Sequence, residues 1–245
     1  MLKKLIIAHR GFHKFAKENT IESYNKAIEI GADGIEFDVR RTKDGILISH
    51  HDEIIDNKYI SSLTYNQINE IAANQGFHVP TVEEVLKLAQ GKIKLFVELK
   101  EEGYEDEITK LLLRYLHLEE FIVISFNVRS LQLIKSNYTY VKIGLLLRTK
   151  KAKILGFIRK VLCFMPSSIL LGVNPDILLP HADGYSLGLL KVAQRDKKNI
   201  VLWTVNDEVM ITRFIKDDMV QGIITDIPDV AIYSRLQVSE VQRNT

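Results

Sequence analysis

Residues 34–52, GIEFDVRRTKDGILISHHD, combine an apolar strand, a tight turn and a second apolar strand. Glu36 and Asp38 alternate with Ile, Phe and Val in the first run, so their side chains share one face of the strand. The Asp-Gly pair at 44–45 predicts a hairpin of type I′, in which both central residues have positive φ. Because the returning strand ends in two histidines, the stretch predicts a hairpin that brings His51 back toward the carboxylates.

Short apolar runs alternate with segments of helical spacing along the whole chain. The predicted barrel strands are Leu5–His9, Gly34–Val39, Lys94–Lys100, Phe121–Phe126, Val141–Leu147, Pro175–His181, Ile200–Val205 and Gly222–Asp226. The predicted helices are Thr20–Ile30, which a capping box of Asn19 and Glu22 would begin, and Val82–Ala89, Asp106–Leu116, Val128–Ser136, Leu187–Lys197 and Asp207–Lys216.

This alternation predicts a parallel sheet covered by helices. Eight such units in 245 residues favour an α/β fold, the (β/α)8 TIM barrel, with an extra β-hairpin after strand two. An open doubly wound sheet is the alternative, but no glycine-rich phosphate loop follows the first strand, so the barrel is the better interpretation.

The composition bounds the class of protein. Apolar residues make up 46% of the chain and charged residues 26%, and no linker-like stretch interrupts residues 1–245, so we expect a single domain. A net charge of +2 gives no reason to expect nucleic acid as a partner. One cysteine, Cys163, fits a reducing compartment, and the apolar run Leu5–Ala8 is too short for a secretion signal, so we expect a cytoplasmic protein.

The carboxyl ends of the predicted strands, where TIM-barrel active sites lie, carry a chemically coherent set of side chains. The set consists of His9, Arg10, Glu36, Asp38, Glu98 and Lys100, with His51 supplied by the hairpin. Three carboxylates converging in an apolar setting need a cation, and oxygen ligands favour Mg²⁺ or Ca²⁺. Arginine and lysine suit phosphate oxygens, and two histidines suit proton transfer, so the set predicts metal-assisted cleavage of a phosphodiester.

Each part of this set also has an ordinary structural interpretation. Glu98 and Lys100 alone would be a surface ion pair, and His9 alone would be a hydrogen-bonded structural histidine. Trp203 and Phe126, at the ends of two later strands, could line the mouth against glycerol or an alcohol, with core packing an equally good interpretation. The prediction therefore rests on the joint placement of the groups at strand ends.

Several segments resemble the glycerophosphodiester phosphodiesterase family. They are AHRG (8–11), ENT (18–20), GADGIEFDVRRTKDG (31–45), HHD (50–52), PTVEEVL (80–86), VELK (97–100), SFN (125–127), WTVND (203–207) and GIITDIPD (222–229). They occur in the family's order over nearly the whole chain. Two departures are Lys17, where the family usually has proline, and Asn199, where it usually has glycine.

The resemblance implies a TIM barrel, one divalent cation, Mg²⁺ or Ca²⁺, and hydrolysis of glycerophosphodiesters to sn-glycerol 3-phosphate and an alcohol. It implies that Glu36, Asp38 and Glu98 bind the metal ion. His9 and His51 would be the proton acceptor and donor, an assignment that the residues alone leave open, as they leave open attack by water or by the glycerol 2-hydroxyl. Arg10 and Lys100 would bind phosphate. His50, beside His51, we interpret as structural.

Residues 148–165, RTKKAKILGFIRKVLCFM, place six basic residues around an apolar stripe at helical spacing. A fifth outer helix of the barrel is the ordinary interpretation. Peripheral contact with an anionic membrane is the alternative, and it would suit a lysophospholipase D-like phosphodiesterase using the same site. A catalytically silent barrel that only binds phosphodiesters or a partner protein is a third hypothesis, and no substituted catalytic position favours it.

Overall fold

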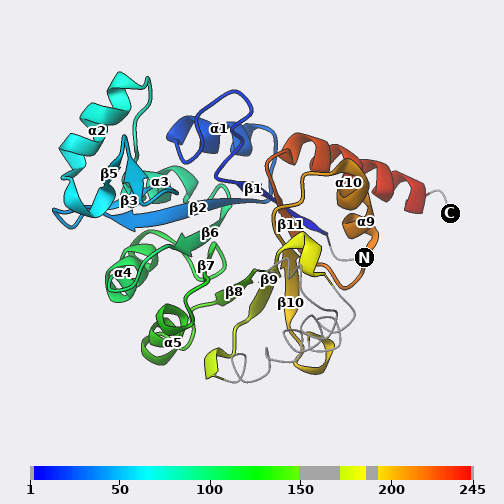
Figure 1. Ribbon diagram of the computed structural model, residues 1–245. Coiled ribbons are helices and arrows are strands. Elements are labelled where there is room, and N and C mark those ends of the chain that lie inside the picture. Colours follow the sequence, from blue (N-terminus) through cyan, green and yellow to red (C-terminus); the bar gives the residue numbers. More distant parts are fainter. Residues whose placement is uncertain (1–2, 149–171, 186–192, 244–245) are drawn as a thin grey trace, which may run out of the picture.

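The computed structural model describes residues 3–148, 172–185 and 193–243, and eight parallel strands in it form a closed barrel (Figure 1). β1 pairs with both β2 and β11, which closes the ring. The predicted TIM barrel is therefore confirmed. The strands are β1 (Leu5–His9), β2 (Gly34–Arg41), β6 (Lys94–Leu99), β7 (Phe121–Ser125), β8 (Ile143–Leu147), β9 (Ile177–Pro180), β10 (Asn199–Leu202) and β11 (Gly222–Thr225).

The predicted hairpin is also present, because β3 (Leu47–Ser49) runs antiparallel to β2 and leads back toward the mouth of the barrel. The prediction of a type I′ turn was wrong. That turn needs two residues with positive φ, and within residues 42–46, all described, only Gly45 has one, of 85°. Thr42 N donates to Ile46 O and Thr42 Oγ1 accepts from Ile46 N, so the turn is a three-residue loop with glycine in the left-handed position.

Helices surround the strands on the outside of the barrel (Figure 1). They are α1 (Ile21–Glu29), α2 (Tyr65–Asn74), α3 (Val82–Ala89), α4 (Glu105–Tyr115), α5 (Val128–Asn137), α9 (Glu208–Lys216) and α10 (Pro228–Arg243). A short β4–β5 hairpin (Ile54–Ile55 and Lys58–Tyr59), a turn of 3-10 helix, η1 (Ile60–Ser62), and α2 lie between β3 and α3, and a second such turn, η2 (Ala182–Gly184), follows β9. The helices predicted for 20–30, 82–89, 106–116, 128–136 and 207–216 all overlap observed ones.

Local sequence explains where these helices begin. Thr81 caps α3, since its side chain accepts from Glu84 N while the Glu84 carboxylate accepts from Thr81 N at 2.7 Å. The cap predicted for α1 was wrong by one residue, because Thr20 and Ser23 form the capping box. Asn19 has a left-handed φ of 56°, and its side chain bonds to Asp38 instead of capping the helix.

Strand parity divides the barrel core into an inner and an outer layer. The outer layer packs against the helices, whereas the inner layer fills the barrel. The inner layer consists of Ile7, Phe96, Ile122, Ile124, Leu146, Ile177, Leu179, Val201 and Ile224, with Leu5, Phe126 and Trp203 packed against it. Residues two positions further along each strand therefore point into the mouth of the barrel.

Parts of two predicted segments lie outside the described residues: 149–165 of the basic apolar segment and 187–192 of the helix predicted over 187–197. Arg148, the first residue of the basic segment, directly follows β8. In the part of the chain that is described, no helix has both the length and the apolar character needed to cross a bilayer.

Candidate active site

The inward-facing residues at the carboxyl ends of the strands form a ring around the barrel mouth. The strand register sets His9 opposite Glu36 and Asp38 opposite Glu98, and an isolated bridge sets His181 opposite Trp203. Charged and imidazole groups occupy the arc from β11 through β1 and β2 to β6, and aromatic groups predominate on the arc from β7 to β10. Around the ring from β1, the residues are His9, Glu36 and Asp38, Glu98 and Lys100, Phe126, Arg148, His181, Trp203 and Asp226.

The three predicted carboxylates meet inside this mouth. Glu36, Asp38 and Glu98 are 2%, 1% and 8% exposed, and one oxygen of each lies within 4.8 Å of the others. Their positions follow from parity, since both acids of β2 face inward beside the inward acid of β6. We refer to these three residues as the acid triad.

Two cations lie against the acid triad. Lys100 Nζ is 2.7 Å from Glu98 Oε1 and 3.1 Å from Asp38 Oδ1. Arg10 Nε is 3.3 Å from Asp38 Oδ2, and Arg10 Nη1 donates to Glu18 Oε1 at 2.9 Å. Because one of the two cations is shared with a fourth carboxylate, the triad keeps an excess of negative charge.

This excess charge shifts the pKa values of the triad. Burial and the neighbouring carboxylates of Asp38 and Glu98 raise the pKa of Glu36 well above its ordinary value. Burial and Asp38 likewise raise the pKa of Glu98. Burial opposes ionisation of Asp38 too, but Lys100 and Arg10 outweigh it and lower the pKa of Asp38.

The acid triad fits a divalent cation. Among the described residues no donor reaches the buried Glu36 Oε1, and an unpaired buried carboxylate oxygen is costly. A donor set made only of oxygens is the kind that Mg²⁺ and Ca²⁺ prefer. A hard dication among these three side chains would use the orphaned oxygen and offset the excess charge.

Asn19 supports Asp38 from the first loop, a role that the sequence did not reveal. Asn19 Nδ2 donates to Asp38 Oδ2 at 2.8 Å, and Asn19 Oδ1 accepts from Tyr24 Oη and Ser49 Oγ. Asn19 is buried, so these bonds fix the orientation of its amide.

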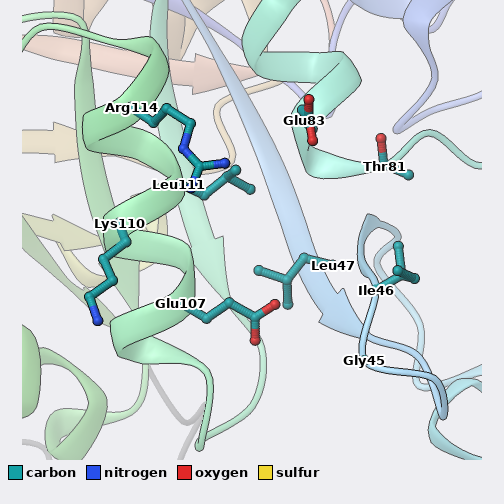
Figure 2. Close-up of a pocket in the computed structure, with 9 residues that line it drawn as sticks. All are labelled: Gly45, Ile46, Leu47, Thr81, Glu83, Glu107, Lys110, Leu111 and Arg114. Atoms are coloured by element: carbon teal, nitrogen blue, oxygen red, sulfur yellow. The ribbon is translucent and has the colours of Figure 1, made fainter.

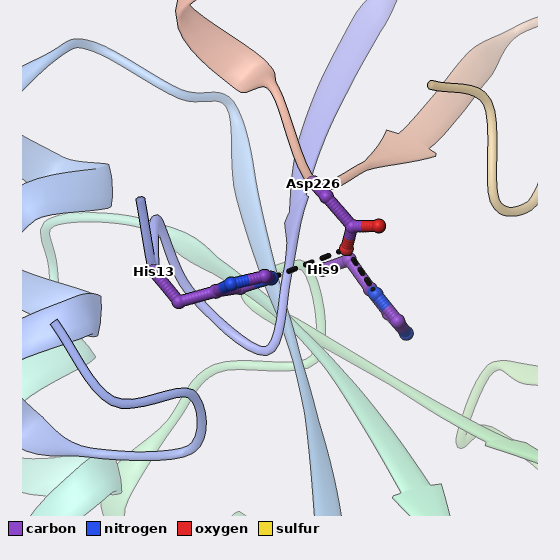
Figure 3. Close-up of side chains that lie close together, drawn as sticks. All are labelled: His9, His13 and Asp226. Carbon is purple, nitrogen blue, oxygen red and sulfur yellow. Dashed lines mark hydrogen bonds and ion pairs between the residues drawn. The ribbon is translucent and has the colours of Figure 1, made fainter. Parts of the chain in front are cut away.

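His9 belongs to a second cluster, which we call the Asp226 cluster (Figure 3). Asp226 Oδ1 accepts from His9 Nδ1 at 2.6 Å and from His13 Nε2 at 3.2 Å. Asn206 Nδ2 donates to the other oxygen, and Asp226 N donates to Asn206 Oδ1 at 2.9 Å. Burial opposes ionisation of Asp226, but the His13 and His9 hydrogen bonds outweigh it and lower the pKa of Asp226.

Sequence reasoning assigned no role to Asp226, Asn206 or His13. Asp226 ends the predicted strand 222–226 with the parity of Ile224, so the strand-end rule used for His9 could have found it. His13 lies in a loop without periodic spacing, and no signal in the sequence connects it to a residue 213 positions away.

His51 reaches the mouth from the hairpin, as predicted. Its Nδ1 donates to Asp52 Oδ1 at 2.8 Å, and Arg40 Nε donates to its backbone carbonyl at 2.9 Å. Burial lowers the pKa of His51, with Asp38 opposing this shift and Lys100 reinforcing it, so these charges lie near the imidazole. His50 is more buried, and burial also lowers its pKa.

A tight turn after β1 places several of these groups together. Arg10 and Gly11 have φ values of 53° and 80°. A Cβ atom on Gly11 would lie 2.4 Å from Ser23 Oγ, and Ser23 Oγ donates to Arg10 O. The turn therefore requires glycine at position 11, and it directs Arg10 N to Glu36 Oε2 at 3.1 Å.

A cavity of about 450 Å³ lies away from the mouth, among the β2–β3 hairpin, α3 and α4 (Figure 2). Leu47, Thr81 and Glu83 line it from one side and Leu111 and Arg114 from the other. It contains no imidazole or carboxylate triad. We therefore place the candidate site at the barrel mouth.

Known proteins resemble this chain over nearly its whole length. The sequence pattern of the glycerophosphoryl diester phosphodiesterase family matches residues 9–230. A glycerophosphodiester phosphodiesterase of Caldanaerobacter subterraneus subsp. tengcongensis is 32% identical over 249 residues, covering 94% of this chain and 97% of that protein.

Solved structures resemble the fold. A glycerophosphodiester phosphodiesterase from Parabacteroides distasonis superposes with a TM-score of 0.77 at 26% identity, covering 97% of this chain and 98% of that one. An Oleispira antarctica phosphodiesterase, solved in complex with the product sn-glycerol-3-phosphate, has a TM-score of 0.78 at 20% identity, covering 94% of this chain and 96% of that one.

The protein is thus an enzyme of the phosphodiester hydrolase class. The chain belongs to the glycerophosphoryl diester phosphodiesterase family, as the matched span and the 32% identical relative show.

Proposed function

We propose that the protein hydrolyses glycerophosphodiesters to sn-glycerol 3-phosphate and an alcohol, with a divalent cation held by Glu36, Asp38 and Glu98. The observation that carries this proposal is the buried acid triad with its orphaned Glu36 oxygen and two adjoining cations. The product named in the Oleispira antarctica complex supports the choice of product.

The cations would bind the phosphoryl group. Arg10 and Lys100 border the acid triad, and their N–H groups can turn from the carboxylates toward phosphate oxygens. Burial opposes both charges, but the neighbouring carboxylates outweigh it and raise the pKa of Arg10 and of Lys100, so both stay charged. A divalent cation bound at the triad supplies Lewis-acid polarisation of a phosphoryl oxygen.

His9 is suited to accept a proton. Its Nδ1–H donates to Asp226, so in the neutral ring Nε2 carries the lone pair, and Nε2 lies 3.9 Å from Glu36 Oε2 on the side of the acid triad. Either nucleophile, water or the glycerol 2-hydroxyl, would give its proton to this nitrogen.

His51 is suited to return a proton to the leaving alkoxide. Its Nδ1 bonds to Asp52, which leaves Nε2 for the substrate. His51 follows the β2–β3 hairpin, whereas His9 ends β1, so the two histidines approach the mouth from different elements.

Release of sn-glycerol 3-phosphate from glycerophosphocholine tests the proposal. The protein is stripped with EDTA and then supplied with Mg²⁺ or Ca²⁺, and metal binding is followed separately by titration calorimetry. We expect no turnover after stripping and recovery on addition of one of the ions. Full turnover in EDTA, or no hydrolysis of any glycerophosphodiester with either ion, would contradict it.

A further inference from the structure

The arc of the mouth opposite the acid triad carries a wall of four side chains from consecutive strands. Phe126 and Trp203 meet edge to face, with ring centroids 5.3 Å apart, and His181 meets Trp203 in the same way at 5.2 Å. The Arg148 guanidinium lies over the Phe126 ring, 4.4 Å from its centroid. We call Phe126, Arg148, His181 and Trp203 the aromatic wall.

The aromatic wall rests on the inner layer of the barrel and faces the mouth. Phe126 and Trp203 both pack on the inner layer of the barrel, and Trp203 Nε1 donates to Leu179 O at 2.7 Å. Its aromatic faces, the His181 imidazole and its one guanidinium, rather than the indole N–H, are therefore what it offers to a ligand.

Arg148 has an uncompensated charge. Among the described residues no carboxylate forms an ion pair with it, and residues 149–171 and 186–192 contain no Asp or Glu. Its side chain is exposed. Arg10 and Lys100, in contrast, each contact at least two carboxylates, so of these three described cations Arg148 is the one that is open to an additional anion.

The Arg148 guanidinium also disfavours one class of head group. A quaternary ammonium binds best over an aromatic face, and Arg148 already covers a face of Phe126 and repels a second cation. An anionic group on the alcohol would instead gain charge-assisted hydrogen bonds from the planar guanidinium.

The wall lies within reach of the same substrate. It fills the arc between Lys100, directly after β6, and Asp226, directly after β11, and the interior of an eight-stranded barrel is only wide enough for side chains or one small ligand. A phosphodiester held by Arg10 and Lys100 would extend its alcohol across this mouth. Resting on the function proposed above, we propose that the aromatic wall binds the alcohol and that Arg148 selects glycerophosphodiesters whose alcohol carries an anionic group.

The test compares three diesters that differ at the alcohol: glycerophosphoglycerol phosphate, glycerophosphoglycerol and glycerophosphocholine. The loss of each intact diester gives kcat/KM. We expect Arg148→Met, which keeps the apolar contact with Phe126, to lower kcat/KM for the phosphorylated substrate by about tenfold to a hundredfold. The neutral substrate should be unchanged, and the choline substrate should improve by about two- to fivefold.

Two variants control for charge and packing. Arg148→Lys keeps the charge and should retain most of the preference for the phosphorylated diester. Arg129→Gln removes one positive charge from the first turn of α5, outside the wall, and should leave all three kcat/KM values as in the wild type. An equal fall for all three diesters in Arg148→Met, or the same loss of preference in Arg129→Gln, would overturn the proposal.

Calorimetric titration with glycerophosphoglycerol phosphate separates this proposal from the proposed function. A wild type that turns over no diester refutes the hydrolase proposal. The titration then still decides on the wall: weaker binding by Arg148→Met supports it, and equal binding by the two proteins refutes it.

Discussion

The acid triad and the Asp226 cluster meet at His9, yet they balance charge in opposite ways. The triad has three nearly inaccessible carboxylates, and two of their buried oxygens, Glu36 Oε1 and Asp38 Oδ1, receive no hydrogen bond from the described residues. In the Asp226 cluster a single carboxylate receives two imidazoles and an amide. Both groups bring potential ligand atoms within 4.8 Å of one another.

The difference shows that the spacing of ligands alone does not define a metal site. Asp226 already uses both oxygens, so a cation there would have to displace existing hydrogen bonds. Glu36 has an oxygen that only an added group can satisfy. We therefore expect the triad to bind an ion and the Asp226 cluster to orient an imidazole.

The strongest test of this contrast removes the unsatisfied oxygen. We expect Glu36→Gln to abolish binding of Mg²⁺ and Ca²⁺ in calorimetry and to lower turnover by about a thousandfold, the loss typical when a main electrostatic contribution disappears. Glu105→Gln is the matched control, because Glu105 is a buried acid that bonds to Ser130 and to Gly103 outside the mouth. If Glu36→Gln still bound either ion, the acid triad would not be the metal site, and the contrast with the Asp226 cluster would be wrong.

A second test uses the adjacent histidines of the hairpin. His51→Asn should lower kcat by about 10²- to 10⁴-fold, because a positioned proton donor contributes that much. His50→Asn should leave kcat within a few-fold of the wild type. Equal losses in the two variants, at unchanged thermal stability, would show that the hairpin acts only as a structural support.

Asp226→Asn tests the orienting role of the Asp226 cluster. Because His9 would keep its place but lose its fixed tautomer, we expect kcat to fall by about tenfold to a hundredfold, part of what a positioned base supplies. KM and the affinity for Mg²⁺ should change little. A loss of metal binding comparable to that of Glu36→Gln would instead make Asp226 part of the ion site.

The same variant has a predicted effect on acid stability. The pKa of Asp226 is lowered in the folded protein, so ionised Asp226 stabilises the fold above the ordinary aspartate pKa of about 4, and this stabilisation disappears as the pH falls through the folded pKa. Wild type should therefore exceed Asp226→Asn in unfolding free energy at neutral pH, and the difference should shrink below about pH 4. A difference independent of pH would contradict this.

The smallest expected effect concerns the second imidazole. His13→Asn leaves the His9–Asp226 bond in place, and a partly exposed imidazole–carboxylate pair is worth at most about 1 kcal/mol, so kcat should stay within about fivefold of the wild type. A loss as large as that of Asp226→Asn would show that the two histidines act as a unit.

The sequence predicted the barrel and most of the mouth because both follow local rules. Strand parity and the rule that barrel sites lie at strand ends were sufficient for Glu36, Asp38, Glu98 and Lys100. The hairpin signal was sufficient for His51, although a three-residue loop replaced the expected turn.

The missed groups depend on barrel closure or on backbone conformation. Asp226 contacts His9 only because the last strand pairs with the first, 217 residues apart. Asn19 was predicted to cap α1, but its left-handed φ turns the amide to Asp38 instead, and local propensity does not foresee this.

The positions of several groups in the mouth depend on the turn at Gly11. The imidazole of His9, the main-chain amide that donates to Glu36 and the guanidinium of Arg10 all belong to two consecutive residues, which directly precede Gly11. A single added methyl at position 11 would push this segment off the first helix and displace all of them at once. A substitution that adds only one carbon atom would thus disturb the proposed proton acceptor, a hydrogen bond to Glu36 and a proposed phosphate-binding group together.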